Sequence, residues 1–235
     1  MGMLKKRLIV LLFLVMLTGA AALRLPLFAV SAVLVEGTQA LSPDAVGLLA
    51  GIRPGDNIFR FDAREAAEGV LDHPLVQGVT VQKILPDRIK IVVKERVPIA
   101  LVPHFNAYLA VDASAVALMV VNDLSVLRLP LITGIDTTEA RLGEAVESKA
   151  LLVGVDCLRA LDRAWLEQIS EVHIDKNLVI TAYTMDKSVI TLGIADNQVA
   201  AKMEALQAML RDLYSRGERG QRINLTQLNR PVIQR

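Results

Sequence analysis

The chain has 235 residues, which is enough for a short anchor and one or two modest domains. Its 26 basic and 25 acidic residues give a formal net charge of +1, which disfavours a nucleic-acid-binding protein because such proteins gather a basic excess on one face. The single cysteine, Cys157, excludes an internal disulfide framework and a cysteine-cluster metal site.

The N-terminus combines a short basic patch at positions 5–7 with an uncharged apolar run over residues 8–23. A helix over this run spans about 24 Å, and flanking basic side chains such as Arg24 can extend its reach toward both surfaces of a bilayer. The positive-inside rule then predicts a cytoplasmic tail at 1–7, a transmembrane helix at 8–25 and an exported remainder.

A cleaved signal peptide is the alternative interpretation of this segment. A basic start, a short apolar stretch and the small residues at 20–22 are all typical of one. Both interpretations export the residues after about position 25, so the bulk of the chain is expected outside the cytoplasm.

Residues 29–97 predict a compact α+β module. A strand at 29–36 ends at Gly37, and helices are expected to begin at the capping residues Ser42 and Asp62. Two strands follow, in which apolar and charged side chains alternate in a pattern typical of a half-buried hairpin. Their predicted ranges are 77–84 and 88–95.

The second part of the chain, residues 98–228, predicts a larger mixed β-sheet domain with two helices. The strands are expected at 98–103, 107–112, 115–121, 130–133, 169–174, 177–184, 187–194 and 222–226, and the helices at 146–162 and 196–215. Residues 229–235 are polar and basic and are expected to form a C-terminal tail.

The sequence contains no motif for catalysis, for cofactor binding or for a metal site. His73, His104 and His173 lack metal-ligand spacing, and Cys157 falls on the apolar face of a predicted helix, where it is expected to be a buried small hydrophobe. Asp112 is expected to form a turn. The pair at 95–96 is interpreted as a joint between the domains or, alternatively, as a partner contact.

Several stretches, taken in order behind one N-terminal anchor, resemble the FtsQ/DivIB family of bacterial cell-division proteins. They are VLVEG at 33–37, LSPD at 41–44, GIRPGDNIF at 51–59, HPLV at 73–76, LPDRIKIVVKERVP at 85–98, YLAVD at 108–112, LPLITG at 129–134 and RINL at 222–225. Those up to residue 98 are similar to a POTRA domain. After Asp112 this sequence lacks the glycine turn that is usual in the family.

The resemblance implies a POTRA-like βααββ domain at 29–97 and an FtsQ-type β domain at 98–228. It also implies a non-catalytic scaffold at the division septum that helps to couple septal cell-wall synthesis to division, with no cofactor and no small-molecule substrate. The implied partners are other bitopic division proteins with coiled-coil stems, of the FtsB/DivIC-like and FtsL-like kinds, together with the cell membrane through residues 8–25.

We expect the partner-binding site at the last predicted strand, because a strand that returns late to a sheet easily falls at its rim and can accept a partner strand. The residues of this expected edge are Ile223, Asn224, Leu225, Thr226, Gln227 and Leu228.

Three alternatives remain open from the sequence. One is an exported POTRA-containing binding module, and another is a cell-wall enzyme whose site is not recognised. The third, a role in outer-membrane assembly, is disfavoured because the two predicted helices do not suit a C-terminal barrel.

Overall fold

The computed structural model describes residues 7–14, 16 and 26–234. Residues 7–14 and 16 are helical, and the apolar side chains at 8–14 are each more than half exposed. The rest of the predicted transmembrane segment, the tail at 1–6 and Arg235 lie outside the described residues. Within the described ranges, no helix combines the length and the apolarity that crossing a membrane requires. The anchor therefore stays a prediction.

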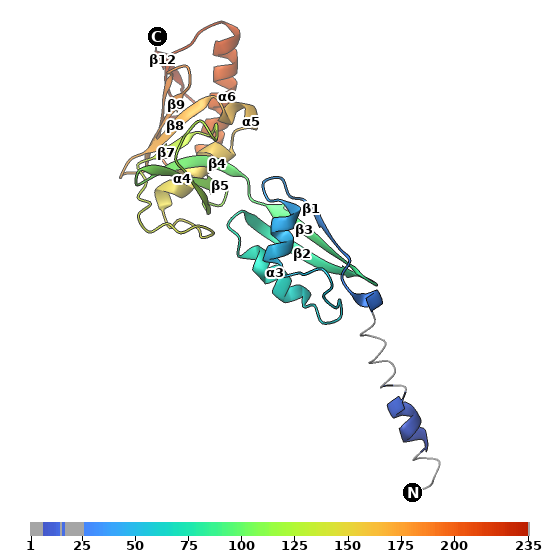
Figure 1. The fold of residues 1–235 in the computed structure, drawn as a ribbon. Helices are drawn as coiled ribbons and strands as arrows, with labels where there is room; N and C mark the ends of the chain where they lie inside the picture. Colours follow the sequence, from blue (N-terminus) through green and yellow to red (C-terminus); the bar gives the residue numbers. More distant parts are fainter. Residues whose placement is uncertain (1–6, 15, 17–25, 235) are drawn as a thin grey trace. The chain divides into compact units, whose positions relative to one another are not determined.

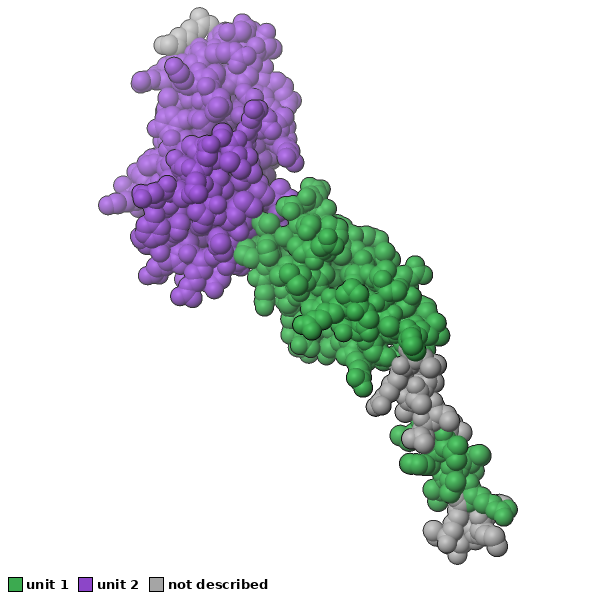
Figure 2. Space-filling view, in the orientation of Figure 1, with its two compact units in different colours: residues 1–95 green, residues 96–235 purple. Residues whose placement is uncertain are grey.

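The chain divides into two compact units, residues 1–95 and 96–235, which Figure 2 draws in different colours. Each unit has its own hydrophobic core and combines strands with helices, so the predicted α+β class is confirmed.

The first unit is a three-stranded sheet with two helices (Figure 1). Its elements are the 3-10 helix η1 (Pro26–Phe28), β1 (Ala32–Glu36), α2 (Pro43–Leu49), α3 (Ala63–Leu71), β2 (Val76–Ile84) and β3 (Arg88–Glu95). The central strand β3 runs parallel to β1 and antiparallel to β2. The predicted alternation in β3 is confirmed, because Ile89, Ile91 and Val93 are buried in the core of this unit.

Both predicted helix starts of the first unit are confirmed. The Ser42 hydroxyl accepts the backbone N–H of Ala45 at 3.2 Å, and the Asp62 carboxylate accepts that of Arg64 at 2.8 Å. Each cap satisfies a donor that the first turn of a helix leaves unpaired, which fixes where the helix begins.

The second unit is built on a nine-stranded mixed sheet in the order β12–β11–β10–β9–β8–β7–β4–β5–β6. Its strands are β4 (Pro98–His104), β5 (Ala107–Asp112), β6 (Ala117–Val121), β7 (Leu131–Thr133), β8 (Ile169–Ile174), β9 (Val179–Thr184), β10 (Val189–Ile194), β11 (Arg222–Asn224) and β12 (Val232–Gln234). Its helices are α4 (Lys149–Arg159), α5 (Arg163–Leu166) and α6 (Val199–Ser215).

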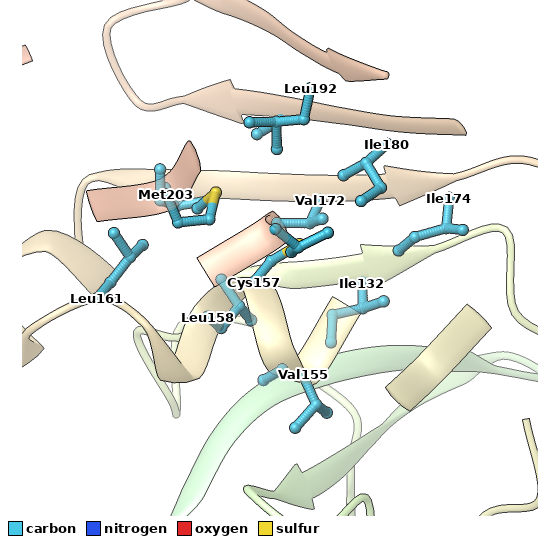
Figure 3. Close-up of a cluster of buried hydrophobic side chains, with 14 of the residues drawn as sticks. Ile132, Val155, Cys157, Leu158, Leu161, Val172, Ile174, Ile180, Leu192 and Met203 are labelled. Atoms are coloured by element: carbon cyan, nitrogen blue, oxygen red, sulfur yellow. The ribbon is translucent and has the colours of Figure 1, made fainter. Parts of the chain in front are cut away.

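The core of the second unit lies where α4 packs on β4, β7 and β8 and against α6 (Figure 3). A Cβ atom on Gly154 of α4 would lie 2.7 Å from Ile132 Cγ2, so a glycine there permits the close approach of helix and sheet. Cys157 is fully buried in this core, as predicted, and burial raises the pKa of its thiol to about 12.

Two differences from the predicted elements have local causes. Helix α4 begins at Lys149 rather than at residue 146, because the backbone N–H of Val146 donates to Ala115 O and Ser148 caps the helix instead. Within the predicted tail at 229–235, Val232–Gln234 forms the strand β12 instead.

We expect Gly134→Ala to destabilise the second unit by about 2 to 4 kcal/mol. Gly134 has φ +85°, and a Cβ there would overlap the carbonyl oxygen of Ile174. The matched control is Gly217→Ala, which has φ +76° but open space around the Cβ, so about 1 kcal/mol of backbone strain is expected. Urea unfolding followed by the fluorescence of Trp165, the single tryptophan, measures both variants. Equal losses in the two variants would contradict the overlap.

Candidate partner-binding edge of the large sheet

The expected binding strand does not lie at the rim of the sheet. Strand β11 pairs with β10 in parallel through Arg222–Asn224 on one side and with β12 in antiparallel on its other side. The predicted rim position of residues 223–228 is therefore wrong, because the chain turns after β11 and adds one further strand. Partner binding by these residues stays a prediction.

The residues of the expected edge serve the fold in ways that the sequence did not reveal. Ile223 and Leu225 are buried, and the backbone N–H of Leu225 donates to Thr191 O of β10 at 2.8 Å. The side-chain oxygen of Asn224 accepts the backbone N–H of Thr226 at 2.9 Å, which begins the turn that continues through Gln227 and Leu228. Leu225 therefore has no backbone donor to offer to a partner.

Strand β12 is the last strand of the sheet, and within the described residues no strand pairs with its outer side. All three of its side chains are exposed, including Val232 at 49% and Ile233 at 41%. The residues that flank β11 bond to β10, through the backbone C=O of Gln221 and the backbone N–H of Leu225. Backbone groups alternate in direction along a strand, so those of Arg222 and Asn224 point toward β12. By the alternation of an antiparallel ladder, Ile233 directs its N–H and C=O toward the open side.

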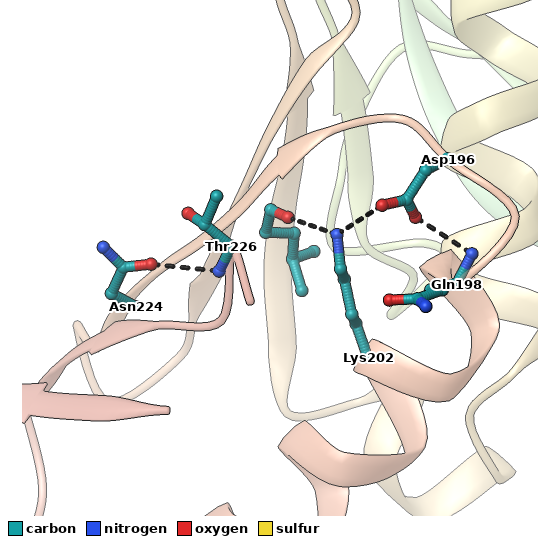
Figure 4. A network of polar contacts seen from close by, with 6 residues as sticks. Asp196, Gln198, Lys202, Asn224 and Thr226 are labelled. Carbon is teal, nitrogen blue, oxygen red and sulfur yellow. Dashed lines mark hydrogen bonds and ion pairs between the residues drawn. The ribbon is translucent and has the colours of Figure 1, made fainter. Parts of the chain in front are cut away.

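A buried lysine supports the strand that carries this edge (Figure 4). The ammonium group of Lys202 in α6, 2% exposed, donates to Leu192 O of β10 at 3.0 Å and to the Asp196 carboxylate at 2.9 Å. The other Asp196 oxygen accepts the backbone N–H of Gln198 at 2.9 Å. Hydrogen bonding from Lys202 is the main reason that the pKa of Asp196 is lowered. The start of α6 is thereby tied to the middle of β10.

The tie lies beside an irregularity of β10. The register with β9 shifts between Thr191 and Gly193, and a Cβ on Gly193 would lie 2.9 Å from Thr226 Cγ2. Leu192 lies within this register shift, and its carbonyl accepts the hydrogen bond from the Lys202 ammonium. The same step brings β10 against the turn that leads to β12.

A second polar cluster holds the chain before β11. The Asp186 carboxylate accepts the Thr184 hydroxyl and the backbone N–H of Gly220, the latter at 3.3 Å. Burial raises the pKa of Asp186, but hydrogen bonds, of which those from Thr184 and Gly220 count most, outweigh that effect and lower it. Nearby, Tyr214 stacks on Trp165 with ring centroids 5.7 Å apart. The chain is thus fixed where it leaves α6 for the sheet.

The other candidate residues are dispersed. The ring nitrogens Nδ1 of His73, His104 and His173 contact the Leu75 backbone N–H, the Thr137 hydroxyl and the Thr133 hydroxyl respectively. Within the described residues, no group of three or more histidine, cysteine, aspartate or glutamate side chains is placed to hold a metal ion.

Glu95 and Arg96 each bind within their own unit. The Glu95 carboxylate accepts backbone N–H groups of Ala40 and Leu41, whereas the Arg96 guanidinium donates to Asp112 at 2.7 Å. The interpretation of this pair as a joint therefore stays untested.

Asp112 also explains the missing glycine turn. Its other carboxylate oxygen accepts the backbone N–H groups of Ser114 and Val116 at 2.8 and 2.9 Å. These bonds hold the turn while Ala115 adopts a φ of +58°, a conformation usually left to glycine. The predicted turn-forming role of Asp112 matches the observed geometry.

Two family models match this chain along most of its length. The POTRA domain of FtsQ type matches residues 28–96, and the C-terminal domain of the cell division protein FtsQ/DivIB matches residues 100–226. The chain belongs to the FtsQ/DivIB family of cell-division proteins.

Individual relatives agree with this assignment. Cell division protein FtsQ of Anaeromyxobacter sp. (strain K) is 29% identical over 83% of this chain and 67% of its own length. FtsQ of Corynebacterium glutamicum is 25% identical over 80% and 82%, and cell division protein DivIB of Clostridium acetobutylicum is 26% identical over 69% and 62%.

The solved structures that match include an extracytoplasmic domain. It is the major extracytoplasmic domain of the trans isomer of DivIB from Geobacillus stearothermophilus, with a TM-score of 0.37 and 17% identity, covering 49% of this chain and 92% of that chain.

Replacing the buried lysine tests the tie between α6 and β10. Lys202→Met keeps most of the side-chain volume but leaves Leu192 O without its donor, so we expect the second unit to lose about 1 to 3 kcal/mol of unfolding free energy. The exposed Lys176→Met serves as the control and is expected to change the free energy by less than about 0.5 kcal/mol. Urea unfolding followed by Trp165 fluorescence measures both, and an unchanged Lys202→Met midpoint would refute the supporting role.

Proposed function

We propose that the chain is a membrane-anchored, non-catalytic scaffold of the cell-division complex. It binds other single-pass division proteins outside the cytoplasm and helps to couple septal cell-wall synthesis to division. Its membership in the FtsQ/DivIB family supports the role in division. The observation that carries the binding role is the open side of β12 at the end of the nine-stranded sheet.

Strand addition suits the chemistry of this edge. An incoming strand would pair with the outward N–H and C=O of Ile233 and cover the exposed apolar side chains of Val232 and Ile233. The edge carries no lysine and no inward-pointing charge within β12, which are common devices for blocking unwanted strand pairing. The partner class is a bitopic division protein with a coiled-coil stem, FtsB/DivIC-like or FtsL-like.

The N-terminal run supports the proposed anchor. Its apolar side chains at 8–14 are each more than half exposed, and the basic patch precedes them. Burial of such side chains in lipid is favourable, whereas exposure to water is not.

We expect Ile233→Pro to weaken binding of the FtsB/DivIC-like protein from the same organism by at least about tenfold, because proline removes the outward N–H and disturbs pairing at the open side. Ile233→Ala keeps this N–H and is expected to retain most of the affinity. Affinity is measured with the full-length chain, and Trp165 fluorescence checks that both variants are folded. A folded Ile233→Pro chain that binds as tightly as the parent would exclude β12 as the acceptor.

N-terminal sequencing of the protein isolated from membranes tests the anchor. We expect the apolar run at 8–23 to be retained, because the proposed scaffold depends on it for attachment. A mature chain that begins at Leu23 would show cleavage after Ala22 and would overturn the anchored arrangement.

A further inference from the structure

One end of the first unit combines exposed apolar and basic side chains on three neighbouring segments. We call this surface the Pro26 end. Its residues are Leu27 of η1, Phe59 and Arg60 of the loop before α3, and, around the β2–β3 turn, Lys83 near the end of β2, Leu85 of the turn itself and Arg88 at the start of β3. Leu27, Phe59 and Leu85 are 62%, 44% and 58% exposed, and a group of exposed apolar side chains rimmed by polar residues can mark an interaction site.

Direct contacts hold these three segments together. The rings of Phe28 and Phe59 meet edge to face with centroids 4.9 Å apart. The Ser31 hydroxyl donates to the Asp87 carboxylate at 2.6 Å, so the segment after η1 lies against the β2–β3 turn, as Figure 1 also shows. These contacts fix the three segments relative to one another, so the Pro26 end is one continuous surface of the first unit.

The acidic groups of this end are engaged by the protein. Asp87 accepts the Ser31 hydroxyl, while Asp56 and Asp62 accept backbone N–H groups of Arg53 and Arg64 at 2.9 and 2.8 Å. These hydrogen bonds do not remove the carboxylate charges, and Arg88 lies 4.0 Å from the Asp87 carboxylate. The cations of this end that no carboxylate of the described chain pairs with are Arg60 and Lys83, whose ammonium lies 5.6 Å from the centre of the Phe61 ring.

The length of chain before η1 places this end close to the membrane. The apolar run ends at Leu23 and η1 begins at Pro26, so the intervening residues reach at most about 10 Å when fully extended. The opposite end of the sheet lies one β2 strand away, which is nine residues or about 30 Å. If residues 8–25 cross the bilayer, the Pro26 end must lie within or just above the headgroup layer, and the opposite end need not.

We propose that the Pro26 end is a lipid-binding surface that seats the first unit on the outer face of the membrane. Leu27, Phe59 and Leu85 enter the boundary between headgroups and acyl chains, and the neighbouring cations pair with lipid phosphates, most strongly on an anionic bilayer. This inference rests on the proposed anchoring of residues 8–25. It also predicts the orientation of the first unit, with the Pro26 end at the membrane surface and the opposite end of the sheet away from it.

The test uses the full-length chain in vesicles of phosphatidylcholine with phosphatidylglycerol, and in vesicles of phosphatidylcholine alone. A fluorophore that reports polarity is attached to Leu85→Cys or, as the matched site, to Leu71→Cys. Leu71 is 49% exposed at the end of α3, near the start of β2 and thus at the opposite end of the sheet. Labelling is selective because Cys157 is buried with a raised pKa.

We expect nitroxide-bearing lipids to quench the label at position 85 at least about twofold more than the label at position 71, with a blue-shifted emission only at position 85. Lys83→Glu combined with Arg88→Glu should reduce this quenching in the anionic vesicles. The same change of charge in the second unit, Lys176→Glu with Lys187→Glu, should leave it unchanged.

The outcomes separate this inference from the proposed function. A chain that fails to float with the vesicles after an alkaline wash refutes the anchor itself, and with it the seat. A chain that floats but shows equal quenching at the two positions refutes the seat alone. If quenching at position 85 is equal in the anionic and the neutral vesicles and is unchanged in the charge-reversal variant, the cations of the Pro26 end do not pair with lipid phosphates.

Discussion

The exposed edge of the second unit depends on the pairing of β10 with β11, a parallel contact of three residue pairs. Short parallel pairing is weak by itself, so the neighbours of β10 have to keep it in place. The ammonium of Lys202 does so from the helix side and Asp186 from the turn that leads into β10. These polar contacts add to the burial of Ile223 and Leu225 in keeping β11 in register.

The last two strands of the sheet differ in how far their side chains are buried. Ile223 and Leu225 of the β11 segment are buried and belong to the core, whereas the side chains of β12 remain exposed. A change in β11 therefore acts first on stability. A change in β12 removes little buried area, which makes it a surface that can vary with its partner while the fold is kept.

The sequence predicted those elements whose causes are local. Ser42 and Asp62 cap helices through hydrogen bonds to residues two or three positions away, and the alternation in β3 follows from its own side chains. Strand β12 has no comparable signal in the sequence. Its three residues are exposed and show no apolar alternation, and they pair with β11 only because the chain turns back after that strand. The hydrogen bond from Lys202 to the Leu192 carbonyl could not be predicted from the sequence either, because it depends on a register shift between β10 and β9.

The lone cysteine has a consequence for quality control. A thiol with a pKa of about 12 carries almost no thiolate near neutral pH, and thiolate is the species that forms and exchanges disulfides. The Cys157 thiol of the folded protein is thus poorly reactive, whereas a chain that has not yet closed its core exposes a reactive sulfur. Oxidative cross-linking through Cys157 would mark misfolded copies and spare native ones.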